Sequence, residues 1–148
     1  MTERPIHILL VEDNPDHAMM TTRALKRGKL NNTVHWVKNG QEALDYLFRQ
    51  DGYADAGKAP TPGLVLLDLN LPKYSGFEIL QRIKQDEALK ALPVVMLTTS
   101  GRDEEVKKCY DLGANSYITK PVQFEDFADV IQKLELYWLL VNRLPQLP

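Results

Sequence analysis

Five short runs rich in apolar and β-branched residues recur along the chain, and each is followed by a segment whose apolar positions have helical spacing. The runs are IHILLV (6–11), TVHWV (33–37), LVLLDL (64–69), VVMLTT (94–99) and SYIT (116–119). Runs of this length and character are typical of strands covered on both faces of a parallel sheet. Strands that alternate with helices in this way predict an α/β fold with a doubly wound, five-stranded parallel sheet.

The segments between these runs place apolar residues three or four positions apart, as amphipathic helices do. Helices are expected over 15–26, 41–50, 77–89, 103–113 and from 124 to about 144. Asn14-Pro15 provides an N-cap followed by proline at the first helical position, and Gly28 and Gly113 are expected to end two of the helices. Residues 51–62, rich in Gly, Ala and Pro, are predicted to form a loop. We expect residues 1–148 to form a single domain, with a C-terminal helix and tail over about 123–148.

Polar side chains gather where the predicted strands end. They are Glu12 and Asp13 after the first strand, Asp68 and Asn70 at and after the third, Thr98, Thr99 and Ser100 at the end of the fourth, and Lys120 after the fifth. The functional crevice of such sheets lies at the carboxyl ends of the strands. Asp68 interrupts an apolar run, and an unpaired carboxylate there would be costly. We expect this cost to be offset because Asp68 lies at the carboxyl edge of the sheet, near other charged groups.

Three carboxylates at one edge repel one another, and a proton or a cation must relieve that repulsion. Glu12-Asp13 alone is readily explained as a solvated turn, but its convergence with Asp68 and Lys120 favours a site for a hard divalent cation such as Mg²⁺. Asp68 could then be a metal ligand, a general base or a nucleophile that attacks phosphorus. Lys120 and the hydroxyl group of Thr98 would stabilise the charge that develops during such an attack.

Composition narrows the class of protein further. The chain has 148 residues, a net charge of −2 and one cysteine, Cys109. The charge gives no global field that would favour nucleic acid, and a lone cysteine excludes an intramolecular disulfide and a cysteine-based zinc site. The three histidines, His7, His17 and His35, are expected to be structural. Neither a signal peptide nor a run of about 20 apolar residues is visible, so a soluble cytoplasmic protein without membrane contact is expected.

Four motifs taken together identify a family. VEDN (11–14), LLDLNLP with SG (66–72 and 75–76), VVMLTTS (94–100) and SYITKP (116–121) resemble the receiver domain of bacterial response regulators, the CheY-like family with a flavodoxin-like (βα)5 fold. The resemblance covers about residues 6–141. It implies that Asp68 accepts a phosphoryl group, that Lys120 contacts this group, and that no external substrate is turned over.

The resemblance also assigns roles to residues around Asp68. It implies that Glu12, Asp13, Asp68 and the backbone carbonyl of Asn70 hold Mg²⁺. Thr98 and Tyr117 would form a coupled switch, and Asn70 and Ser100 would tune the lifetime of the phosphoryl group. The Lys120–Pro121 peptide bond is expected to be cis, a form that proline makes accessible.

A narrower resemblance concerns the partners. DYLFRQ with the loop after it, LTTSGRDEEV and the ending YWLLVNRLP are similar to single-domain regulators paired with bacterial and cyanobacterial phytochrome histidine kinases. This implies a two-component phosphorelay whose output is protein contact through the helix at 103–113, the strand at 116–119 and the last helix. No DNA-binding or enzymatic domain is expected after residue 148.

The end of the last helix points to self-association. LELYWLLV (134–141) is apolar almost all round, more than one core face requires. A homodimer through Tyr137, Trp138, Leu140 and Val141 is predicted, and the resemblance supports it. The alternative is that the tail folds back onto its own domain.

Two other functional classes fit part of the pattern. A phosphatase of the haloacid dehalogenase type also uses an aspartate at a strand end with Mg²⁺, but it carries a DxD motif on its first strand, where this chain has EDN (12–14). A pseudo-receiver binds partners without phosphorylation, but such proteins usually lack the acids, the aspartate or the lysine, and this chain has all of them. The phosphoacceptor is therefore the preferred hypothesis.

Overall fold

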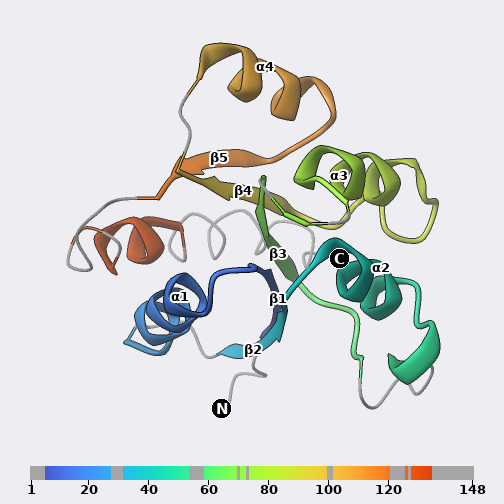
Figure 1. Ribbon diagram of the computed structural model, residues 1–148, viewed down its shortest axis with the longest axis horizontal. Coiled ribbons are helices and arrows are strands. Elements are labelled where there is room, and N and C mark those ends of the chain that lie inside the picture. The colour runs from blue at the N-terminus through green and yellow to red at the C-terminus, as the bar shows by residue number, and fades with distance from the viewer. Residues whose placement is uncertain are drawn as a thin grey trace, which may run out of the picture.

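Five parallel strands form one sheet in the order β2-β1-β3-β4-β5 (Figure 1). The computed structural model describes residues 6–27, 32–53, 59–69, 71–72, 74–99, 102–120, 126 and 128–134. The strands are β1 Ile6–Val11, β2 Asn32–Val37, β3 Leu64–Asp68, β4 Val94–Thr98 and β5 Ser116–Thr119. Each pairing between neighbouring strands is parallel. The predicted doubly wound α/β fold is therefore confirmed.

Helices cover both faces of this sheet, as the alternating pattern predicts. They are α1 Pro15–Arg27, α2 Gly40–Leu47, α3 Gly76–Gln85 and α4 Asp103–Asp111, with a short 3-10 helix, η1 Asp51–Tyr53. Residues 128–134 are also helical. Figure 1 shows α1 and this last helix on one side of the central strands, with α2 and α3 on the other.

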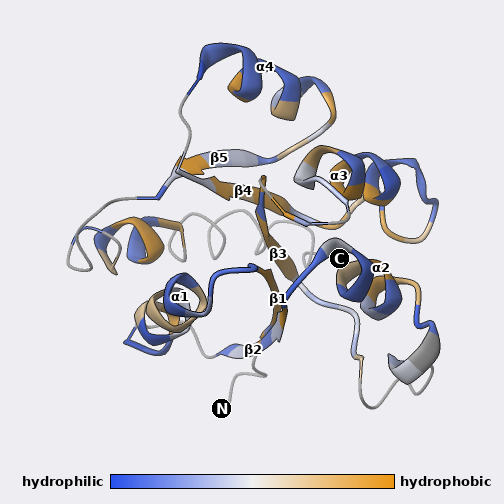
Figure 2. Ribbon diagram, viewed as in Figure 1, coloured by the Kyte–Doolittle hydropathy of each residue, from blue (hydrophilic) through white to orange (hydrophobic). Residues whose placement is uncertain are grey.

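The core consists of two apolar clusters, one on each face of the sheet. Ile8 and Leu10 contribute to the cluster beneath α1 and the last helix, whereas Leu9 and Val11 contribute to the cluster beneath α2, α3 and α4. This alternation follows from the two-residue period of a strand. Every residue of β3 and β4 is buried, and the central strands in Figure 2 are correspondingly hydrophobic in colour.

Several predicted element bounds were wrong. α3 stops at Gln85 rather than at residue 89, because the Asp86 carboxylate accepts hydrogen bonds from the backbone N–H groups of Ala88 and Leu89, at 2.8 and 3.1 Å, and so forms a turn. α2 ends at Leu47 rather than at residue 50, and Arg49 just after it has a left-handed φ of 52°. The predicted loop at 51–62 begins with η1.

Other predicted features lie outside the described residues, namely the end of the first helix at Gly28 and the course of the last helix beyond residue 134. Within the described segments, no helix has the length and apolar character that crossing a membrane would require.

Candidate functional site

The strand ends bring four buried polar residues to one edge of the sheet. Val11 pairs with Leu67, Asp68 with Leu97, and Thr98 with Thr119, so the carboxyl ends of β1, β3, β4 and β5 are level. Glu12 follows β1 and is 1% exposed, Asp68 ends β3 and is 6% exposed, and Lys120 follows β5 and is 8% exposed. Thr98 ends β4 and is fully buried. The register thus confirms that these side chains share the predicted edge.

Lys120 joins the acidic residues of this edge. Its Nζ donates to Glu12 Oε1 and to Asp68 Oδ2, the latter at 3.1 Å. Its backbone N–H donates to the carbonyl of Thr98 at 2.6 Å, which ties the residue to the end of β4. Removing an ammonium group from water is unfavourable unless acceptors replace the water, and the two carboxylates do so here.

Glu12, Asp13 and Asp68 form an oxygen-rich cluster. One carboxylate oxygen from each lies within 4.8 Å of the others. Burial raises the pKa of Glu12 to about 7, and the neighbouring Asp68 also raises it, whereas Lys120 lowers it. A positive charge placed among these oxygens would restore the ionised form of Glu12. Three carboxylate oxygens of this kind fit a hard divalent cation.

The backbone around Glu12 is held by strand β2. Trp36 Nε1 donates to the Glu12 carbonyl at 2.8 Å, and the Glu12 N–H donates to the carbonyl of Val37 at 3.1 Å. The N–H of Asn14 donates to Glu12 Oε2 at 3.3 Å. Asp13, the next residue, is exposed at the mouth of the site. These contacts fix Glu12 at the end of β1.

His17 was expected to be structural, yet it lies at this site. The side chain of Asn14 caps α1 as predicted, accepting from the N–H groups of Asp16 and His17 at 2.9 and 3.2 Å. His17 Nδ1 lies 3.3 Å from Lys120 Nζ and 3.9 Å from Glu12 Oε1. Burial, together with the charge of Lys120, lowers the pKa of His17. A residue in the first turn after a strand end points back toward that end, and this was the available signal.

A side-chain hydrogen bond joins Thr98 and Tyr117, the two residues for which the resemblance implies a coupled switch. Tyr117 lies in β5 beside Met96 of β4 and is half-buried. Burial raises the pKa of Tyr117 to about 12, as do the nearby Glu105 and Cys109, whereas a side-chain hydrogen bond with Thr98 lowers it. This hydrogen bond therefore links Thr98, at the buried end of β4, to half-buried Tyr117 in β5.

Several predicted site residues fall outside the described part of the chain. They are Asn70, Ser100, Pro121 with its expected cis peptide bond, and the residues of the predicted dimer contact, Tyr137, Trp138, Leu140 and Val141. Their roles stay predictions.

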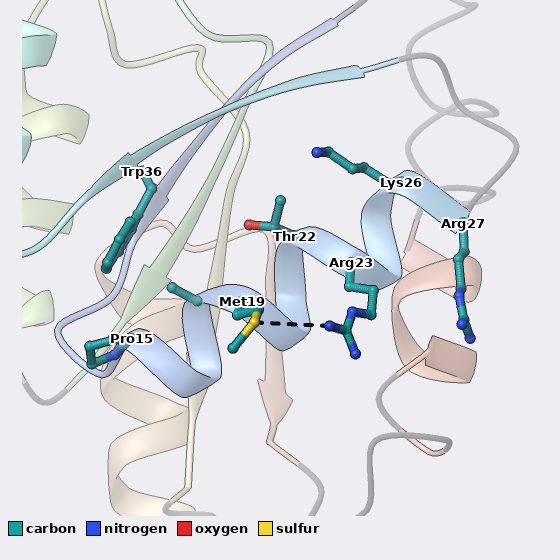
Figure 3. Close-up of a pocket in the computed structure, with 8 residues that line it drawn as sticks. Pro15, Met19, Thr22, Arg23, Lys26, Arg27 and Trp36 are labelled. Carbon is teal, nitrogen blue, oxygen red and sulfur yellow. Dashed lines mark hydrogen bonds between the residues drawn. The ribbon is translucent and has the colours of Figure 1, made fainter.

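A separate surface pocket of about 450 Å³ lies on the flank of α1 that faces β2 (Figure 3). Met19 and Trp36 supply exposed apolar surface, 53% and 40% exposed. Its lining residues are Pro15, Ala18, Met19, Thr22, Arg23, Lys26, Arg27 and Trp36. None of these described lining residues is acidic, so the pocket is unlike the carboxylate site and is distinct from it.

Comparison with known proteins agrees with this site. Residues 8–132 match the family model described as the response regulator receiver domain. The chain is 45% identical over 143 residues to a probable methanogenesis regulatory protein, FilR2, of Methanothrix harundinacea, covering 97% of this chain and 90% of that protein. It is 38% identical over 141 residues to the response regulator Rcp1 of Synechocystis, covering 95% and 94%.

Solved structures show the same fold. The phosphorylated cyanobacterial phytochrome response regulator RcpA superposes with a TM-score of 0.85 at 39% identity, over 92% of this chain and 95% of that one. The Mn²⁺-bound form of Rcp1 gives a TM-score of 0.83 at 38% identity, over 91% and 95%. Because the family model spans most of the chain and the buried acid–lysine edge has the composition that the four motifs imply, this chain belongs to the response regulator receiver domain family.

Proposed function

We propose that this chain is a response regulator of a two-component phosphorelay, which accepts a phosphoryl group from a histidine kinase on Asp68 in the cytoplasm. The observation that carries the proposal is the placement of Asp68. Its carboxylate is 6% exposed, lies 3.1 Å from Lys120 Nζ, and shares an oxygen cluster with Glu12 and Asp13. A rigid, partly desolvated carboxylate beside a cation is suited to nucleophilic attack.

In the proposed reaction, a carboxylate oxygen of Asp68 forms a bond to phosphorus while the P–N bond of the donor phosphohistidine breaks. The imidazole leaves with the electron pair of that bond and takes up a proton from solvent. Lys120 stabilises the phosphoryl oxygens through its ammonium group. No redox change and no further co-reactant is involved, so the protein itself is a substrate and a switch rather than an enzyme that turns over an external substrate.

Mg²⁺ is the proposed cofactor. Glu12, Asp13, Asp68 and the backbone carbonyl of Asn70 would hold it, and it would supply charge neutralisation for the phosphoryl oxygens. The oxygen cluster supports this choice, since hard carboxylate ligands match a hard ion. Asn70 and Ser100 are proposed to set the lifetime of the acyl phosphate by shaping the access of water.

The proposed output runs from Thr98 to the surface. The Thr98 hydroxyl would turn toward the phosphoryl group and Tyr117 would move inward, which changes the face made of α4, β5 and the last helix. The existing hydrogen bond between the two side chains supports their coupling. A ligand or modification shifts such a two-state equilibrium only through contacts that differ between the two states. The hydrogen bond from the Thr98 hydroxyl to the phosphoryl group would be such a contact.

The proposed partners are a histidine kinase of the phytochrome type and a second copy of this chain. The similarity to RcpA supports the first. Tyr137, Trp138, Leu140 and Val141 are proposed to form the homodimer contact. Sedimentation of the full chain as a dimer, and of a chain truncated after Gln132 as a monomer, is the expected result; two monomers would contradict the dimer. No direct contact with nucleic acid or membrane is proposed.

Incubation with acetyl phosphate and Mg²⁺, followed by intact-protein mass spectrometry, tests the phosphoacceptor. The native chain is expected to gain the mass of one phosphoryl group, and Asp68→Asn and a chelator-treated sample are expected to gain none. An identical gain on Asp68→Asn would refute the assignment, and no gain on the native chain would favour a pseudo-receiver. Sustained hydrolysis of p-nitrophenyl phosphate would instead indicate a phosphatase.

A further inference from the structure

We propose that His17 is a positioning residue that holds the Lys120 ammonium group toward Asp68 for phosphoryl transfer. The inference rests on the proposed phosphoacceptor function, and it concerns a residue that none of the four receiver motifs includes. His17 would act on the reaction through Lys120, because its ring Nδ1 lies 3.3 Å from Lys120 Nζ.

The first argument is the number of donors and acceptors. An ammonium group has three N–H donors and no lone pair. Lys120 Nζ has three partners, Glu12 Oε1, Asp68 Oδ2 at 3.1 Å and His17 Nδ1 at 3.3 Å. Each donor therefore has its own acceptor. Because lysine cannot accept, Nδ1 of His17 must provide the lone pair, which places the ring proton of the neutral imidazole on Nε2.

The second argument is that His17 is itself held in place. Its backbone N–H donates to the Asn14 side chain at 3.2 Å, and its carbonyl accepts from Thr21 Oγ1 at 2.8 Å. Thr21 is a fully buried residue of α1 itself. The ring thus projects from the capped first turn of a helix that packs on the sheet, and it can act as a fixed point for a long lysine side chain.

The third argument concerns charge. A carboxylate that accepts from Lys120 neutralises part of its charge, whereas a neutral imidazole fixes one N–H without doing so. An anchor of this kind leaves the ammonium group able to stabilise new negative charge on phosphoryl oxygens. Preorganised donors are effective in catalysis because they need no reorientation when charge develops.

Two substitutions separate an acceptor from a space-filling group. His17→Asn places an amide oxygen close to the position of Nδ1 and can accept from Lys120. His17→Leu fills similar volume without an acceptor. With acetyl phosphate and Mg²⁺, His17→Leu is expected to slow phosphorylation of Asp68 about tenfold, the order expected for the loss of one charge-assisted hydrogen bond, and His17→Asn is expected to recover most of the rate.

Two further measurements test the route through Lys120. In a Lys120→Met background, His17→Leu is expected to have no additional effect on the residual rate, because coupled residues are not additive. Mg²⁺ affinity measured by calorimetry should change less than about twofold in His17→Leu, since a positioning residue for the lysine leaves the carboxylates in place. An additive loss in the double variant, or a rate loss explained by weaker Mg²⁺ binding, would overturn the inference.

The native protein provides a test that does not depend on how a variant folds. Long-range ¹H–¹⁵N spectra should show His17 as the Nε2–H tautomer at neutral pH, and an Nδ1–H tautomer would refute the inference. Equal phosphorylation rates for native and His17→Leu proteins would refute it as well, as would equal losses in the Leu and Asn variants. Failure of the native chain to gain a phosphoryl group on Asp68 would instead remove the proposed function, and this inference with it.

Discussion

Helix α1 borders two charged regions that differ in how their charges are treated. At the carboxyl edge of the sheet, Glu12, Asp68 and Lys120 are buried and bonded to one another. In the pocket on the other flank of the helix, Arg23, Lys26 and Arg27 are exposed around an apolar floor (Figure 3). His17 faces the first region and Met19 the second, because helical residues two positions apart point in different directions.

This difference in burial predicts how strongly substitutions in each region change the stability of the protein. Buried charges have lost their water and depend on their partners, so removal of one partner leaves another group without compensation. Exposed charges keep their water, and their contributions to stability are small and screened by salt. Substitutions at the edge should therefore lower the free energy of unfolding of the domain markedly, whereas those at the pocket rim should change it little.

The largest loss of stability is expected for Gly76→Ala. This variant tests whether the backbone at the end of β3 can move to make room for a methyl group. A Cβ at Gly76 would lie 2.5 Å from the Asp68 carbonyl oxygen and 2.7 Å from Leu69 Cα, both backbone atoms. The free energy of unfolding, measured with urea, should fall by about 3 kcal/mol. Gly52→Ala is the matched control, because nothing lies within 4 Å of its added Cβ. A similar loss in both variants would contradict the packing argument.

Lys120→Met tests the dependence of the buried acids on a cation. With a chelator present, the free energy of unfolding should fall by about 2 kcal/mol, somewhat less than for a fully enclosed ion pair because Glu12 can take up a proton. Excess Mg²⁺ should recover much of this loss, because an ion that binds only the folded state stabilises it.

The control for this prediction is an exposed ion pair. Lys107 Nζ lies 2.9 Å from Asp111 Oδ2, with side chains 79% and 63% exposed. Lys107→Met should change stability by less than about 0.5 kcal/mol, with no response to Mg²⁺. Equal losses in the two variants would show that burial does not distinguish the pairs.

The sequence predicted which residues lie at the carboxyl edge of the sheet better than it predicted the contacts among them. Apolar runs that stop at Glu12 and Asp68 reveal both the parallel sheet and the edge where functional groups gather, because strand burial and strand ends are local properties. The end of α3 depended on Asp86, whose side chain competes with the helix for backbone N–H groups. Such competition between local hydrogen bonds is poorly resolved by apolar spacing alone.

The contacts of His17 and Trp36 were not predicted, because they are tertiary. His17 meets Lys120 across 103 positions of the chain, and Trp36 meets Glu12 across 24. No periodic pattern encodes either pair. They follow from the strand order β2-β1-β3-β4-β5 and from the position of α1 over the sheet, neither of which the apolar pattern alone specifies.

Trp36→Phe tests a side chain that belongs to both regions. Its ring forms part of the pocket, while its Nε1 donates to the Glu12 carbonyl at 2.8 Å. Phenylalanine keeps an apolar ring and removes the donor, so the free energy of unfolding should fall by about 1 kcal/mol. Tyr110→Phe, at a side chain that is 48% exposed, should change it by less than about 0.5 kcal/mol. No loss for Trp36→Phe would mean that the two regions are independent.

A pH-dependent loss of stability is expected from the opposite face of β2. His35 Nε2 lies 3.0 Å from His7 Nδ1, and burial, followed by the charge of His7, lowers the pKa of His35 below its usual value of 6.5. The unfolded chain then binds more protons than the folded one below about pH 6.5, so the stabilising contribution is complete above that pH and is lost as the pH falls.

Urea titrations of native protein and His35→Gln between neutral and mildly acidic pH would measure this contribution. The stability of the native chain should fall further than that of the variant as the pH decreases. The raised pKa of Glu12 acts with the opposite sign, but it is common to both proteins and cancels in their difference. Parallel profiles for the two proteins would contradict the assignment.

The smallest effect is expected at the pocket rim, for Lys26→Gln. Lys26 is an exposed base in the last turn of α1, where its main contribution is attraction to the negative end of the helix dipole. That attraction is worth a few tenths of a kcal/mol and should fade at high salt, so urea titrations in low and high salt should converge. A loss above about 1 kcal/mol that persists in high salt would mean that Lys26 is as dependent on partners as Lys120. Exposure would then no longer explain why the two flanks of α1 differ.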